Sequence, residues 1–193
     1  MRDTLLGSTQ PVLTISLEPG EGVLATTAGF AWMTDSIQMA PAHSGLSAYT
    51  ARGTAGTIAF AARLPGSILT VQVTPERDYL VQRWAFLAGT PGIKLGAGPP
   101  GHDFAVCRVA GHGRAWIELS GDAVRHDLAA GMSLRTHPWH IGMSDASVTV
   151  QLAELPEVSD SKAGEARQVA VVSGPGSVWL QSMALLVTSP RTS

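Results

Sequence analysis

Apolar and polar residues alternate along much of this chain with the two-residue period of β-strands. Leu13, Ile15 and Leu17 occupy every second position of one such segment, between smaller or more polar residues. Because side chains alternate between the two faces of a strand, this pattern predicts half-buried strands. It recurs in three further segments, at residues 68–73, 115–119 and 147–152. Helical spacing is weak, and the single helical turn we expect is Ala123–Ala130.

Two stretches of the chain resemble each other closely. The segment Gly174–Ser182, with the sequence GPGSVWLQS, has an earlier counterpart in Gly111–Leu119, with the sequence GHGRAWIEL. In a fainter third copy, Ala55–Ala61, we place Phe60 at the tryptophan position, which requires the turn glycine to have moved by one residue. Internal similarity of this kind indicates a structural unit that is used more than once.

A second set of residues recurs at nearly the same interval. The aromatic residues Phe60, Trp116 and Trp179 are almost evenly spaced, and so are the leucines at positions 24, 80 and 134. Two independent markers therefore predict a β module of roughly 56 residues in three tandem copies. We expect an all-β fold in which residues 1–193 form a single domain of three pseudo-repeats, roughly 1–54, 55–110 and 111–193.

Composition supports a β-rich chain that contacts other subunits. Of the 193 residues, 45% are hydrophobic and only 15% are charged, against roughly 25% charged in an average globular protein. A low charged fraction leaves less well-solvated surface than a monomer would need, so we expect part of the surface to contact other subunits. The 21 glycines and 12 prolines interrupt the chain too often for long helices.

Charge and cysteine content restrict partners and compartment. A net charge of −2, with basic residues spaced singly, gives no positive surface for nucleic acid. The single cysteine, Cys107, excludes an internal disulfide, lies among small apolar residues and fits a buried site in a reducing compartment. The N-terminus lacks the apolar core and cleavage site of a signal peptide, so we expect the protein to start at Met1 and to be cytoplasmic.

One segment is long enough to raise the question of a membrane span. Residues 168–190 carry no charge, but the turn-forming Gly174-Pro175-Gly176 and nearby serines would leave polar groups without partners in lipid. We therefore predict two buried strands joined by a tight turn. The preceding polar segment, Pro156–Arg167, is predicted to be a solvated hairpin loop.

Two motifs suggest chemistry that the surrounding residues do not support. The glycine-rich stretch Gly96–Gly101 contains two consecutive prolines, which remove amides that a phosphate would need, so we interpret it as a loop. His137 and His140 could form half of a metal site with His126 and Asp127. They meet only if the chain bends at Pro138, and an ordinary surface or hydrogen-bonded histidine pair is the favoured interpretation.

No other segment has the spacing of catalytic machinery. A nucleophile elbow, a phosphate-binding loop and zinc-type Cys/His spacing are all missing from the sequence. We therefore predict no catalytic residue, no metal ligand and no cofactor site. Trp116 and Trp179 are interpreted as anchors of the core or of a subunit interface, with each indole N–H finding a backbone acceptor.

Several short motifs, in this order along the chain, resemble the altered inheritance of mitochondria protein 24 family. The resemblance covers the whole chain and is carried by LEPGE at 17–21, LPGSI at 64–68, GHG at 111–113, DLAAG at 127–131 and GPGSVWLQS at 174–182. It implies three short double-stranded β-helix subdomains, similar to the tryptophan RNA-binding attenuation protein, and three chains closing a ring of nine lobes. Fungal members are linked to organisation of the mitochondrial inner membrane, and the resemblance implies no catalytic residues here.

A ring is also favoured on physical grounds, because side-by-side repeats leave an open sheet edge at each end that rotational closure would cover. We expect a homotrimer, with three times the 20.1 kDa mass of the single chain. The favoured function is a non-enzymatic ring-forming β scaffold or interaction protein, with surface loops that recruit protein partners. The alternative is a small-ligand or RNA-binding module with sites between lobes, where glycine turns such as Gly111-His112-Gly113 expose amides to an anion. A metal-dependent cupin-like enzyme ranks third.

Overall fold

The protein is built almost entirely of antiparallel β-sheet. The computed structural model describes residues 1–99, 106–154 and 168–184, and their only helices are three single 3-10 turns, at Thr27–Gly29, His43–Gly45 and Pro138–His140. None of these helices is long and apolar enough to cross a membrane. The all-β prediction is confirmed, whereas the loop predicted at 156–167 lies outside the described residues.

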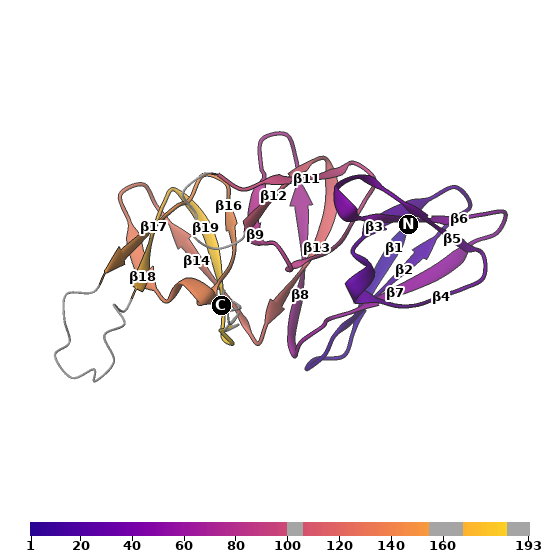
Figure 1. Ribbon diagram of the computed structural model, residues 1–193, viewed down its shortest axis with the longest axis horizontal. Coiled ribbons are helices and arrows are strands. Elements are labelled where there is room, and N and C mark those ends of the chain that lie inside the picture. The colour runs from indigo at the N-terminus through magenta and orange to yellow at the C-terminus, as the bar shows by residue number, and fades with distance from the viewer. Residues whose placement is uncertain (100–105, 155–167, 185–193) are drawn as a thin grey trace, which may run out of the picture.

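Three groups of strands lie side by side along the long axis of the molecule, in chain order (Figure 1). The first group contains β2 (Val12–Leu17), β3 (Gly22–Ala25), β4 (Phe30–Met33), β5 (Ile37–Pro41), β6 (Ser47–Ala51) and β7 (Gly56–Ala61). The second contains β8 (Gly66–Val73), β9 (Tyr79–Gln82), β10 (Phe86–Gly89), β11 (Ile93–Ala97), β12 (Val106–Gly111) and β13 (Gly113–Ser120). The third contains β14 (Ala123–Leu128), β15 (Ser133–Thr136), β16 (Ile141–Asp145), β17 (Thr149–Glu154), β18 (Gln168–Ser173) and β19 (Gly176–Gln181). An additional strand, β1 (Arg2–Leu6), precedes the first group.

The same pairing scheme is found inside all three groups. The sixth strand pairs with the first and the third, and the fifth strand pairs with the second and the fourth. Each pairing of a third with a sixth strand also has a register shift after its first residue. The arrangement is therefore repeat-like, with strands grouped as 12–61, 66–120 and 123–181. The boundaries expected after residues 54 and 110 stay a prediction.

Strand pairing corrects one detail of the expected alignment. Gly56 begins β7, in the same place as the glycines that begin β13 and β19, so the turn glycine has not moved. Counting from these glycines, Ala59 takes the place of Trp116 and Trp179, and Phe60 lies one residue further on. Phe60 therefore points to the opposite face of the sheet from the indoles. Phe60 resembles the two tryptophans in side-chain type, but Ala59 occupies their position in the strand. An alignment based on aromatic side chains is therefore off by one residue here.

The alternating segments are strands with the expected buried faces. Leu13, Ile15 and Leu17 are buried in a core cluster that includes Trp116 and spans the first two groups. Two further clusters fill the interior of the second and third groups. Apolar side chains from several sheets thus form one row of cores along the molecule, which fixes each strand in its register.

The two remaining structural predictions had different outcomes. The helical turn expected at Ala123–Ala130 is wrong, because Ala123–Leu128 is strand β14 and pairs with β19 along its whole length. This strand lies at the edge of its sheet with four consecutive exposed residues, so its sequence shows no two-residue alternation. The segment after residue 167 does form two strands joined by a tight turn at Gly174-Pro175, as predicted.

Candidate functional site

Neighbouring strand groups are connected by one recurring strand pairing, which we call a joint. β3 of the first group pairs with β10 of the second, and β9 of the second pairs with β16 of the third. Each joint uses the second strand of one group and the third strand of the next. Ala25 lies opposite Ala88 at the first joint, Val81 lies opposite Met143 at the second, and all four side chains are at most 1% exposed.

This scheme leaves half of a joint at each end of the chain. β4 is a third strand and forms the last strand of its four-stranded sheet, whereas β15 is a second strand and forms the outer strand of its three-stranded sheet. Among the strands that the structure describes, neither has a neighbour on its outer side. Open strand edges expose N–H and C=O groups that readily pair with another strand. We call Phe30–Met33 the β4 edge and Ser133–Thr136 the β15 edge, and treat them as the candidate functional site.

The β4 edge presents aromatic side chains to solvent. Trp32 is 48% exposed and Phe30 is 38% exposed. Phe30 is held in place by stacking on Tyr49, with ring centroids 5.7 Å apart. On the β15 edge, Leu134 is partly buried and Arg135 is exposed. The β4 edge is apolar, which is typical of a protein interface and not of a surface that stays in water.

The indole of Trp32 has a counterpart at each inner joint. Trp116 lies opposite the small Ala88 on the neighbouring strand, and at the other joint Trp179 occupies the corresponding place. On the β4 edge the large and small residues have changed strands: the tryptophan, Trp32, is on the third strand and the small Ala59 lies opposite it on the sixth. Each inner joint and the β4 edge therefore contribute one indole at this level of the sheet. Sequence analysis missed Trp32 because its alignment followed the aromatic Phe60 and not the register of the glycines.

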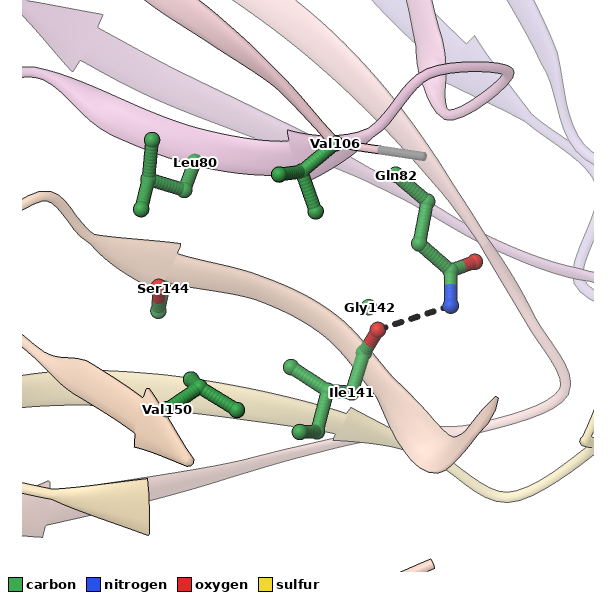
Figure 2. Close-up of a pocket in the computed structure, with 7 residues that line it drawn as sticks. All are labelled: Leu80, Gln82, Val106, Ile141, Gly142, Ser144 and Val150. Atoms are coloured by element: carbon green, nitrogen blue, oxygen red, sulfur yellow. Dashed lines mark hydrogen bonds between the residues drawn. The ribbon is translucent and has the colours of Figure 1, made fainter. Parts of the chain in front are cut away.

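A small hollow lies at the second joint, between the second and third groups. Figure 2 shows side chains from both groups pointing toward a common space, with Gln82 donating to the backbone oxygen of Ile141 at 2.8 Å. The space has room for about one water molecule, far less than the roughly 300–1,000 Å³ of typical small-molecule sites. Its lining contains no ionisable side chain and consists of Leu80, Gln82, Val106, Ile141, Gly142, Ser144 and Val150. The hollow is therefore too small for a ligand of ordinary size, and its lining is unsuited to an anion.

Two buried glutamines form a polar connection beside the hollow. Gln181 donates to the backbone oxygen of Trp139 at 2.9 Å and accepts from the amide of Ser120 at 3.1 Å. Its side-chain nitrogen also lies 3.4 Å from the side-chain oxygen of Gln82. These bonds satisfy buried polar groups that have no access to water, so the two glutamines stabilise the joint. Because their side chains are engaged in this way, they are not free to bind a ligand.

A charged cluster covers the other side of the second joint. The buried hydroxyl of Ser177 donates to Asp127 at 2.6 Å, and Arg125 donates to the same carboxylate at 2.8 Å. These bonds, Ser177 first, hold the pKa of Asp127 below its usual value. Asp145 accepts from the Ser177 amide at 2.8 Å and from Arg77 at 3.1 Å, and its hydrogen bond raises the pKa of Arg77.

This cluster holds two strand groups together and lacks the arrangement of a catalytic serine. Ser177 has a carboxylate neighbour, but no imidazole is among its hydrogen-bond partners in the described part of the chain. A serine nucleophile needs a base that takes its proton, and an ionised aspartate already held by an arginine is a poor one. Arg77 belongs to the second group and Asp145 to the third, so their ion pair fastens the two groups together.

The predicted histidine pair is brought together by a bend at Pro138. His137 and His140 flank the 3-10 turn, and their ring centroids lie 6.1 Å apart. His140 donates from Nδ1 to the backbone oxygen of Gln181 at 2.7 Å. His126 lies on β14. Within residues 1–99, 106–154 and 168–184, no group of three or more His, Cys, Asp and Glu side chains is arranged to hold a metal ion.

Two glycine-containing segments considered for anion binding are engaged in β-structure. Strand β11 continues through Ala97, so the loop predicted at Gly96–Gly101 can begin only after that residue, and residues 100 and 101 lie outside the described part. At the turn between β12 and β13, the amide of His112 donates to the oxygen of Gly92 at 3.1 Å. That amide is therefore not available to an anion.

Comparison with known proteins agrees with the strand arrangement. A family model described as Mitochondrial biogenesis AIM24 matches residues 4–183. The chain belongs to the AIM24 family. The resemblance expected from the sequence motifs is thus confirmed, and the match spans all three strand groups of this AIM24-family chain.

A solved structure shares the fold of this AIM24-family protein. The crystal structure of protein SPYM3_0169 from Streptococcus pyogenes superimposes with a TM-score of 0.78 and 17% sequence identity, covering 95% of this chain and 94% of that chain. At this identity the likeness shows the fold alone. A search of curated proteins found no match.

Proposed function

We propose that this AIM24-family chain is a non-enzymatic scaffold subunit that assembles with copies of itself through the β4 edge and the β15 edge. The observation that supports this proposal is the pairing scheme of the strand groups. Two complete joints lie inside the chain, and the two halves of a third lie at its ends. Because the halves differ, chains would associate head to tail, which gives either a closed ring or an open fibre.

We propose a closed ring of three chains, each of 20.1 kDa. Closure would cover both open edges, whereas a fibre would always leave one at each end. The low charged fraction of 15% supports extensive subunit contacts. The cytoplasmic location stays a prediction, supported by the single buried thiol of Cys107.

A non-enzymatic role is supported by the way the charged groups are used. Asp3 pairs with Arg114, Glu118 pairs with Arg63, and Asp127 pairs with Arg125. In a catalytic site such groups converge on a cleft with room for a substrate. Here the first two pairs tie separate segments of the chain together, and the third lies within strand β14. Surface loops are left to recruit protein partners.

The mass of the purified protein in solution tests the proposal. Light scattering behind a sizing column should give three times the chain mass of 20.1 kDa, unchanged on dilution through the micromolar range. A stable monomer of 20.1 kDa would refute self-assembly, and a mass that grows with concentration would favour a fibre. A pull-down from native lysate should then recover partners in fixed ratio to the ring.

The second candidate function, binding of a small ligand between groups, is favoured by the hollow of Figure 2. Its largely apolar lining would suit an uncharged molecule, although the hollow would have to widen to admit one. RNA is disfavoured by the net charge of −2. A thermal-shift screen against metabolites and short RNAs at low salt separates the two functions. A shift abolished by Ser144→Leu, which fills the hollow, would support ligand binding; a flat screen would leave the scaffold.

A further inference from the structure

We infer that the joint between chains is an antiparallel pairing of β15 of one copy with β4 of the next, with Arg135 opposite Trp32 and Leu134 opposite Met33. This inference rests on the proposed self-assembly and specifies its partner and register. The partner is a second copy because both inner joints combine a second strand with a third strand. A second copy supplies to each open edge the strand that it lacks.

The register follows from the two inner joints. At the first, the leucine of β3, Leu24, lies opposite the fourth residue of β10, Gly89. At the second, the leucine of β9 again lies opposite the fourth residue of its partner strand, β16. In β15 the leucine is Leu134, and the fourth residue of β4 is Met33. Arg135, which follows the leucine, therefore falls opposite the third residue of β4.

This register places Arg135 and Trp32 close together. At the first joint the amide of Thr26 donates to the oxygen of Leu87 at 3.2 Å. In antiparallel sheets the positions alternate, so the adjacent pair, Ala25 with Ala88, is a non-hydrogen-bonded pair, in which side chains approach most closely. Arg135 and Trp32 take the places of these two residues in the joint between chains.

The side chains of this pair complement each other chemically. Within the chain, Arg125 lies directly opposite Trp179 on the neighbouring strand, and its guanidinium carbon lies 5.3 Å from the centre of the indole ring. An arginine over an indole is a favourable cation–π contact. Arg135 and Trp32 would repeat this contact between chains, and the 48% exposure of Trp32 would then be lost.

An engineered disulfide tests the register directly. In a Cys107→Ala background, Trp32→Cys with Arg135→Cys places two thiols at a pair whose Cα atoms should be about 4.5 Å apart, within the roughly 4.4–6.8 Å that a disulfide spans. Mild oxidation should convert the protein to a covalent trimer on a non-reducing gel, with no larger species. The matched control, Trp32→Cys with Leu134→Cys, shifts one thiol to the opposite face and should not cross-link.

A second pair keeps the proposed contact intact. Met33→Cys with Leu134→Cys retains Trp32 and Arg135, and its thiols can be joined with dibromobimane, a short thiol cross-linker. Trimer formation by either pair supports the register, and no cross-link in both overturns it. If the wild type is an assembled ring by light scattering, that failure refutes only the register; if the wild type is monomeric, the proposed scaffold fails with it.

Charge at position 135 provides an independent measure. Arg135→Glu should raise the concentration needed for half-assembly by roughly thirtyfold, because about 1.4 kcal/mol would be lost at each of the three joints of the ring. Arg135→Lys retains a cation over the indole and should recover most of the assembly. Equal weakening by the lysine and glutamate variants, or none by either, would show that Arg135 does not contact Trp32.

Discussion

The indole nitrogen of Trp116 lies 3.2 Å from a carboxylate oxygen of Asp3, although 113 residues separate them in the chain. Asp3 belongs to β1, which pairs with the first strand group, whereas Trp116 belongs to the second group. Arg114 pairs with the same carboxylate, and its guanidinium carbon lies 5.6 Å from the centre of the Trp116 ring. The backbone acceptor predicted for this indole is wrong, and β1 therefore fastens the two groups together.

Removing this carboxylate should weaken the fold. Asp3→Ala leaves the fully buried Trp116 without its acceptor and Arg114 without its partner, so the free energy of unfolding should fall by about 1–3 kcal/mol. Asp3→Asn keeps an oxygen acceptor and should lose less. Urea unfolding followed by tryptophan fluorescence measures both variants, and equal losses would show that the hydrogen bond contributes nothing.

The stability of the fold should depend on pH through Glu118. This side chain is 9% exposed, and its burial raises its pKa above the usual 4.5, although hydrogen bonds and ion pairing with Arg63 oppose the shift. The folded state therefore keeps a proton at pH values where the unfolded chain has lost it. By linkage, this contribution is fully present below pH 4.5 and is lost as pH rises through the raised pKa.

Glu118→Gln should remove this part of the pH dependence. Urea unfolding between about pH 4 and 7 should show the wild type losing stability relative to the glutamine variant as pH rises. Arg63→Ala should steepen the loss, because the carboxylate then has no cation near it. Parallel stability curves for wild type and Glu118→Gln would contradict the raised pKa.

Cys107 should react slowly in the native protein. Its side chain is buried in the core, and burial raises the pKa of the thiol to about 11. Because the thiolate is the reactive form, labelling with Ellman's reagent at pH 8 should be about a hundredfold slower than in urea-unfolded protein. Rapid labelling of one thiol per chain under native conditions would show that the core opens readily at this strand.

The buried Gln181 should be required for full stability of the second joint. Gln181→Leu leaves the Ser120 amide and the Trp139 oxygen without partners, each at a cost of about 1–3 kcal/mol. Gln82→Leu removes the bond to the Ile141 oxygen and the longer 3.4 Å contact with Gln181, and should cost less because only the Ile141 oxygen is a backbone group. Thermal unfolding of both variants provides the comparison. A larger loss of stability for Gln82→Leu would show that Gln82, and not Gln181, contributes most to the stability of the second joint.

Local sequence pattern was sufficient for some features of the fold. Leu13, Ile15 and Leu17 alternate with less apolar residues and lie on a buried face. Cys107 lies among small apolar residues and is buried, and the turn at Gly174-Pro175 separates two strands. These features follow from neighbouring residues, because strand alternation and turn formation act over a few positions.

Other features were decided by pairing between distant segments. Ala123–Leu128 has no apolar alternation, and its strand conformation comes from pairing with β19. The register of Phe60, and the role of Trp32 at an open edge, depend on which strands lie beside β7 and β4. Sequence alone determined that this chain consists of half-buried strands in recurring units. Tertiary structure alone decided which edges stay open, because backbone hydrogen bonds between strands do not depend on side-chain identity.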